Sequence, residues 1–301
     1  MKAFFVILQL TFGMWILMPD VRAQGCSDAG FCTIHSIKPS VNETSSAKNQ
    51  FKTGMTYGVA QYQVTVLSPY LEYTRYMGNV ALSTRLLLGM RLGELTTNTG
   101  LADAIITATW AASSELNFTA GVKVPFNNAN KKIDGRPLPM AYQTSLGTTD
   151  MILGITRSWN KFSISGAWQQ PLTQNGNTFL IDEYPDGILS DPYISTNGYK
   201  RKGDVLLRLS HSTQLSEKII FSSSILPIYH FGDDSYENSE GEEITIDDSK
   251  GLTLNLNVFF QYHLTQNTFV ELNLGGPVVA REKRPDGLSQ FAIAAEYSIR
   301  F

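Results

Sequence analysis

The last twelve residues, Gln290 to Phe301, read Gln-Phe-Ala-Ile-Ala-Ala-Glu-Tyr-Ser-Ile-Arg-Phe. Successive side chains of a β-strand point to opposite faces, so this alternation predicts a strand with one apolar face. That face carries Phe291, Ile293, Ala295, Tyr297, Ile299 and the terminal Phe301. A chain that ends in this way is typical of an outer-membrane β-barrel. We therefore expect Tyr297, Ile299 and Phe301 to form the signal that the barrel-assembly machinery reads.

The N-terminus predicts export. Lys2 precedes an apolar stretch from Ala3 to Met18, and Val21-Arg22-Ala23 forms a small-x-small cleavage site. This pattern is typical of a signal peptide over residues 1–23. A transmembrane anchor is the alternative, but the stretch is slightly short for a spanning helix and lacks the flanking residues of one. The chain has no other apolar run of this length, so we expect an exported protein without a spanning helix.

Composition restricts the function classes. The net charge of −3 and the mean hydropathy of −0.10 suit a soluble domain, but they also suit a barrel whose polar lumen and loops offset an apolar belt. Basic residues do not cluster, which argues against a nucleic-acid partner. The chain is long enough for one barrel. We expect a monomer in outer-membrane lipid, with no cofactor and no metal.

Two cysteines, Cys26 and Cys32, follow the cleavage site closely. In an oxidising compartment such neighbours are expected to form a disulfide. The alternatives are a lipid anchor on Cys26, or a redox or metal pair with His35 as the nearest further ligand. The polar segment 24–53 that contains them is interpreted as either a plug inside the barrel or a periplasmic tail.

Segments of period-two alternation predict twelve strands in a barrel over residues 54–301. The clearest segments are 84–92, 116–126, 162–169, 205–210, 252–264, 268–275 and 290–301, and the weaker ones are 55–66, 70–77, 102–111, 146–157 and 218–231. An even count places both chain ends in the periplasm. The external loops are then 67–69, 93–101, 125–142, 171–203, 232–250 and 277–288; apart from the first, they are longer than the periplasmic turns, as barrels require.

A soluble β-sandwich or soluble barrel is the alternative fold, since periodicity cannot tell which face is outside. In the membrane barrel, the inward face receives nine ionisable residues: Glu72, Arg85, Arg91, Lys123, Arg208, His263, Glu271, Glu296 and Arg300. Their mixed signs predict a salt-bridged lumen and not an ion-selective ring. Loop 171–203 carries apolar residues that we expect to pack into the barrel mouth, with an apolar entry site as the alternative. Loop 232–250 is interpreted as a solvated acidic loop, because its spacing matches no EF-hand Ca²⁺ loop.

Several short motifs resemble a known family. Gly100-Leu101-Ala102-Asp103 before a strand, and Gly121-Val122-Lys123-Val124-Pro125, resemble the "Gly-x-Gly-Asp … Gly-x-Lys-x-Pro" pattern of the phenol meta-pathway-degradation family of outer-membrane transporters. Residues 145–150 and 284–288 resemble the same group, whereas Ala102 departs from its usual glycine. The family is similar to the long-chain fatty-acid channels. The resemblance implies transport of a small, often hydrophobic molecule.

Two other functions remain open at this point. A surface or assembly component could bind a partner through loops 171–203 and 232–250 without transporting anything. A lipid-modifying enzyme would need a His-x-Ser pair on one strand face. The chain offers His211 beside Thr213, at a predicted periplasmic turn, so we interpret this pair as an ordinary polar turn and expect no enzyme.

Overall fold

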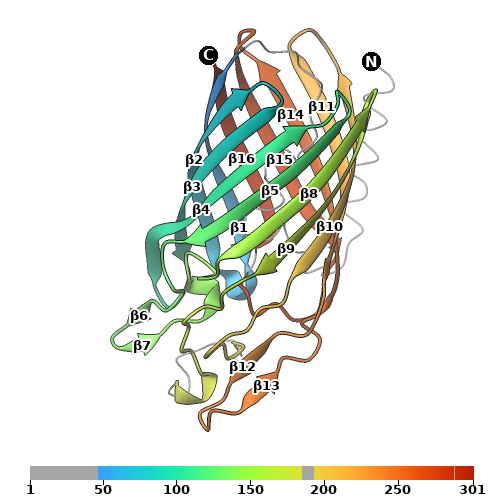
Figure 1. Cartoon of the computed structure of the whole chain (residues 1–301). Coiled ribbons are helices and arrows are strands. Elements are labelled where there is room, and N and C mark those ends of the chain that lie inside the picture. Colours follow the sequence, from blue (N-terminus) through green and yellow to red (C-terminus); the bar gives the residue numbers. More distant parts are fainter. Residues whose placement is uncertain (1–46, 185–192, 288) are drawn as a thin grey trace.

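The computed structural model describes residues 47–184, 193–287 and 289–301. Twelve antiparallel strands form one closed barrel, in which β1 pairs with β16 (Figure 1). The strands are β1 (Asn49–Ala60), β2 (Thr65–Met77), β3 (Val80–Leu92), β4 (Thr97–Ala111), β5 (Leu116–Pro125), β8 (Asp150–Trp159), β9 (Phe162–Pro171), β10 (Asp204–Gln214), β11 (Ile219–His230), β14 (Gly251–His263), β15 (Thr268–Val279) and β16 (Ser289–Arg300). The predicted strand number and antiparallel barrel are confirmed.

The two ends of the barrel differ in their connections. The turn end, where the C-terminus lies, carries the short connections 78–79, 112–115, 160–161, 215–218 and 264–267. The opposite loop end carries 61–64, 93–96, 126–149, 172–203, 231–250 and 280–288. Small hairpins stand there (Figure 1), formed by β6 (Lys132–Ile133) with β7 (Arg136–Pro137) and by β12 (Ser235–Glu237) with β13 (Glu243–Thr245). The 3-10 turns η3 (Gln61–Gln63), η4 (Met140–Tyr142) and η5 (Ile181–Glu183) lie in the same connections.

Several predicted boundaries are wrong. β1 starts at Asn49, so the barrel takes in the last residues of the predicted 24–53 segment. The first loop-end turn is 61–64 and not 67–69, because Tyr62 and Gln63 take positive φ values of 60° and 55° and reverse the chain early. β4 already begins at Thr97, within predicted loop 93–101.

Two further segments also differ from the prediction. Residues 146–149 belong to a connection and not to a strand, because Gly147, with φ of +69°, turns the chain before β8. His211 lies within β10 and not in a turn.

The outer surface of the barrel is apolar and its interior is polar. Large hydrophobic side chains on the outward face are exposed all around the barrel, as with Leu86 at 40%, Leu256 at 39% and Ile155 at 45%. Inward-facing charged and hydroxyl side chains are buried in the same strands, with Lys123 fully buried. A soluble barrel would have the opposite arrangement. The exposed hydrophobic side chains therefore form an apolar belt that is suited to lipid.

Aromatic side chains mark both rims of this belt. Trp110 stacks on Phe118 near the turn end, with ring centroids 5.7 Å apart. Near the loop end, Tyr57 meets Phe291 edge-on at 5.9 Å. Such girdles are typical of the two interfaces of a membrane barrel.

No helix among residues 47–184, 193–287 and 289–301 is both long and apolar enough to span a membrane.

Candidate functional site

A cross-strand ion-pair cluster lies inside the barrel in its turn-end half. Glu72 on β2 stands in register with Lys52 on β1 and with Arg85 on β3. The Arg85 guanidinium contacts the Glu72 carboxylate at 2.5 Å, and Lys52 Nζ lies 3.8 Å from Glu72 and 3.6 Å from Glu296. Arg85 also covers the Tyr70 ring at 4.4 Å. Two acids and two bases are compensated within the cluster, so it adds no net charge to the lumen.

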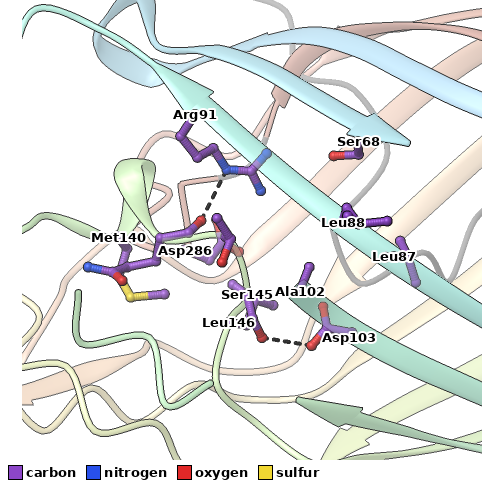
Figure 2. A pocket seen from close by; sticks show the side chains of 12 residues that line it. Ser68, Leu87, Leu88, Arg91, Ala102, Asp103, Met140, Ser145, Leu146 and Asp286 are labelled. Carbon is purple, nitrogen blue, oxygen red and sulfur yellow. Dashed lines mark hydrogen bonds between the residues drawn. The ribbon is translucent and has the colours of Figure 1, made fainter. Parts of the chain in front are cut away.

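The connection between β5 and β8 folds into the loop-end half of the lumen. Its residues 138–148, which we term the inner segment, are all buried. Figure 2 shows this segment against the strand wall. It contacts inward-facing residues of β3, β4 and β5, so it occupies space within the barrel. The inner segment therefore narrows the lumen beneath the loop-end mouth.

Side chains of the barrel wall hold the inner segment by hydrogen bonds. Arg91 Nε donates to the carbonyl oxygen of Gln143 at 3.0 Å, and Asn98 Nδ2 donates to that of Tyr142 at 2.8 Å. Ser145 Oγ donates to Asp103 Oδ1 at 2.7 Å. Each such bond contributes on the order of 1 kcal/mol, and more where a charged group takes part.

Glycines on the wall let the inner segment approach closely. A Cβ at Gly89 would lie 2.8 Å from Thr144 Cβ and 3.0 Å from its carbonyl oxygen. Real Cβ atoms do not approach so closely, so any other residue at position 89 displaces the segment. Gly93 likewise leaves room for the Tyr142 side chain, because a Cβ at position 93 would overlap the Tyr142 hydroxyl.

Lys123 links the inner segment to the next strands. Its ammonium group is fully buried and lies 3.2 Å from Thr148 Oγ1, 3.4 Å from Asp150 and 3.9 Å from Asp103. The two carboxylates compensate the buried charge. Asp150 also accepts a hydrogen bond from the Gln169 amide and lies 3.9 Å from Arg201.

A second group of buried charges joins the remaining loops at the mouth. Arg201 pairs with Asp204, and His230 bridges Asp204 at 2.7 Å and Asp234 at 2.9 Å. Asp234 accepts the Tyr199 hydroxyl hydrogen bond at 2.7 Å. Because these residues come from the 172–203 and 231–250 connections and from two strand ends, the contacts tie both loops to the rim.

Connection 280–288 joins the same group. Arg281 contacts Asp286 at 2.5 Å and donates to the Ser249 carbonyl oxygen at 2.5 Å. Burial alone would raise the pKa of Asp286, but the guanidinium groups of Arg281, Arg284 and Arg201 outweigh burial and lower that pKa below its ordinary value. Asp286 is therefore an anion at neutral pH, held by cations from two connections.

A small cavity of about 20 Å³ lies between the inner segment and the wall formed by β2, β3 and β4. Leu87, Ala102, Met140 and Leu146 form its apolar side, as Figure 2 shows. Its polar side is formed by Ser68, Arg91, Asp103, Gln143, Thr144, Ser145 and Asp286. A cavity of this volume has room for about one water molecule and not for a larger molecule.

The barrel wall is irregular beside this cavity. Ser68 and Pro69 of β2 have no paired residues on β3, although pairing resumes on both sides. Pro69 has no backbone N–H to donate. On the other side of β3, the register with β4 shifts between Leu86 and Leu88. These irregularities coincide with Ser68 and Leu88, which line the cavity.

The nine predicted lumen residues all lie on the inward face. Six are buried: Glu72, Arg85, Arg91, Lys123, Arg208 and Glu296. His263 and Arg300 are partly exposed at the turn end, where each contacts the ring of Phe269, at 5.6 Å and 5.0 Å. Glu271 is partly exposed further along β15. The structure brings Glu72, Arg85 and Glu296 into one cluster, and Arg91 and Lys123 to the inner segment. Their roles in transport stay predictions.

Other predicted residues take simpler places. Phe301 pairs with Asn49 through two backbone hydrogen bonds of 2.9 and 3.0 Å, which close the barrel. Tyr297 faces outward and Ile299 is half-buried. His211 packs against the Phe162 ring at 4.9 Å. Cys26 and Cys32 lie outside the described residues.

Loop 172–203 packs into the mouth, as its composition suggested. Phe179 and Tyr193 are buried in a cluster with Leu138 and Tyr142 from the preceding loop, and Leu180 is buried beside Phe179 in the chain. The predicted acidic loop 232–250 is less solvated than expected, since Asp234 is fully buried and joins the ion pairs described above. The inner segment and the charged mouth were missed from the sequence. The signal that could have indicated a close approach was the pair Gly89 and Gly93 on one strand.

Comparisons with known proteins find distant structural similarity and no sequence match. No family model matches the chain, including that of the phenol meta-pathway family, and no curated protein matches its sequence. Similar solved structures include the toluene transporter TodX of Pseudomonas putida (11% identity, 93% of this chain and 97% of that one, TM-score 0.47), the monoaromatic hydrocarbon channel CymD (9%, 92% and 94%, 0.46) and the porin KdgM (9%, 84% and 99%, 0.45). These likenesses are too distant to assign a cargo.

Proposed function

We propose that the chain is an outer-membrane channel that passes a small molecule, with the loop end outside the cell and the turn end in the periplasm. The single observation that supports this most is the inverted burial of the barrel. Exposed hydrophobic residues face outward on every side, while charged and hydroxyl groups fill the interior. A wall of this kind separates lipid from a polar lumen, which is the basic requirement of a channel.

The proposal is tested with the purified full-length barrel in liposomes. Swelling is measured in neutral solutes of increasing size, such as glycerol, xylitol and sucrose. We expect the smallest solutes to enter and the largest to be excluded, because the inner segment narrows the lumen. Folding is verified in the same sample by heat-modifiable electrophoretic mobility. A folded barrel that leaves the liposomes sealed to every solute and to ions would refute the channel.

A further inference from the structure

The lumen has a second polar surface, across the barrel from the cavity. It is formed by six inward-facing residues of the adjacent strands β10, β11 and β14, which we term the amide wall: Arg208, Ser210, Ser224, Asn255, Asn257 and Phe259. In the strand register, Ser224 stands beside Ser210 on one side and Asn257 on the other. All six side chains are more than nine-tenths buried.

Four of these side chains carry polar atoms that no other group satisfies. Ser210 Oγ, Ser224 Oγ, Asn255 Oδ1 and Asn257 Oδ1 have no hydrogen-bond partner within the part of the chain that the structure describes. A buried polar atom in that state costs about 1–3 kcal/mol. Four such atoms on one surface are therefore expected to serve a partner.

The next pair of hydroxyls on the same strands behaves differently. Ser212 and Ser222 are also cross-strand neighbours, and their hydroxyls bond to each other at 2.8 Å. Ser210 and Ser224 are also cross-strand neighbours, two residues further from the turn end, but their hydroxyls do not bond to each other. A serine pair in this barrel can satisfy itself, so the strand pairing alone does not force Ser210 and Ser224 to stay unbonded.

The unpaired atoms define the chemistry of the partner. An amide oxygen only accepts hydrogen bonds, so the partner must present donors to Asn255 and Asn257. Hydrocarbons have no donors, and neither do ionised carboxylates. A hydroxyl group both donates and accepts, so it suits the amide oxygens and the serines together. Phe259 adds a flat apolar face, with the Arg208 guanidinium 5.8 Å from the ring centroid.

Gly275 leaves room for the Asn257 side chain. The two residues are paired in the β14–β15 register, and a Cβ at Gly275 would overlap the Asn257 amide nitrogen. The glycine has ordinary strand geometry, so an alanine there is compatible with the backbone. A methyl group at position 275 would displace the amide while leaving Asn257 in the chain.

We propose that the amide wall is a binding site for a neutral polyhydroxylated molecule, of the size of a sugar or a small polyol. The inference rests on the proposed channel function and names the class of its cargo. Such a molecule has several hydroxyl groups for the four unpaired atoms and a C–H face for Phe259.

The test measures binding to the purified full-length barrel in detergent, by titration calorimetry and saturation-transfer NMR. Xylitol and glucose are the probes, with acetate and toluene as competitors of other classes. We expect the neutral polyols to bind, and Asn255→Leu with Asn257→Leu to weaken them at least tenfold. Gly275→Ala should weaken them severalfold. Thr107→Val, which alters a buried inward hydroxyl on β4 outside this wall, should leave binding unchanged.

Three results would overturn the inference: no polyol binding by wild-type protein, equal binding by all variants, or binding of acetate or toluene that depends on Asn255 and Asn257. The same preparations are assayed for ion conductance in planar bilayers. A barrel that conducts ions but binds no polyol refutes the amide wall and leaves the channel intact. A folded barrel that binds polyol but passes neither ions nor solutes refutes the channel.

Discussion

Replacement of Gly89 by alanine is expected to release the inner segment. The added Cβ would lie 2.8 Å from Thr144 Cβ and 3.1 Å from its Cα. The contacts include backbone atoms, so the segment must shift as a whole. Overpacking of this kind costs about 1–3 kcal/mol. If this cost destabilises only the state in which the inner segment contacts the wall, the ratio of displaced to bound segment rises roughly 5- to 150-fold.

The matched control is Gly100→Ala. Gly100 is the register partner of Gly89 and faces the same threonine, but its Cβ would lie 3.7 Å from Thr144 Oγ1, which is an ordinary contact. Neither glycine has a positive φ, so both alanines fit the strand backbone. The two variants therefore differ mainly in their overlap with the segment.

The assay is single-channel recording in planar bilayers. We expect Gly89→Ala to open more often, or to a higher conductance, than wild type, while Gly100→Ala behaves as wild type. Hydrogen exchange of residues 138–148 should increase only in Gly89→Ala. If Gly89→Ala folds and neither conductance nor exchange changes, the close approach does not restrain the segment and the reasoning is wrong.

Three further predictions concern charge and lipid. Lys123→Met should lower the free energy of unfolding by about 3–5 kcal/mol in urea titrations of the bilayer-embedded barrel, because it removes the cation that the buried carboxylates of Asp103 and Asp150 share; a loss below 1 kcal/mol would contradict this. The pKa of Asp286 is lowered in the folded protein, so its stabilising effect is complete above the unfolded value of 3.8 and is lost as the pH falls through the lower folded value. Pepsin should therefore cut the 280–287 connection increasingly below that pH, and Asp286→Asn should remove this dependence. Leu256→Arg, at mid-belt, should cost about 2–4 kcal/mol in the same urea titration, whereas Leu215→Arg at the turn end should cost about 0–1 kcal/mol.

The barrel itself was predictable because local periodicity encodes it. Alternation such as that from Leu252 to Leu264 specifies a strand and its two faces. Strand number and loop parity then follow from counting. The first turn was misplaced because Tyr62 and Gln63 take positive φ without a glycine to mark them.

The interior of the mouth was not predictable in the same way. The contacts of Lys123 with Asp150 and of Arg201 with Asp286 join residues from different strands and loops. Such contacts depend on how far each loop folds inward, which the period of a strand does not encode. The inner segment has no periodic pattern. Its position depends on tertiary contacts, such as the close approach of Thr144 to Gly89, which only the structure shows.

The conductance of the barrel with and without its inner segment tests the account most directly. Residues 139–146 are replaced by a short Gly-Ser linker, and residues 238–242 at the tip of the β12–β13 hairpin are replaced in the control. Folding of each variant is verified by circular dichroism. We predict a severalfold higher single-channel conductance for the first variant and the wild-type value for the second. Equal conductances in all three folded proteins would contradict the claim that residues 138–148 constrict a channel.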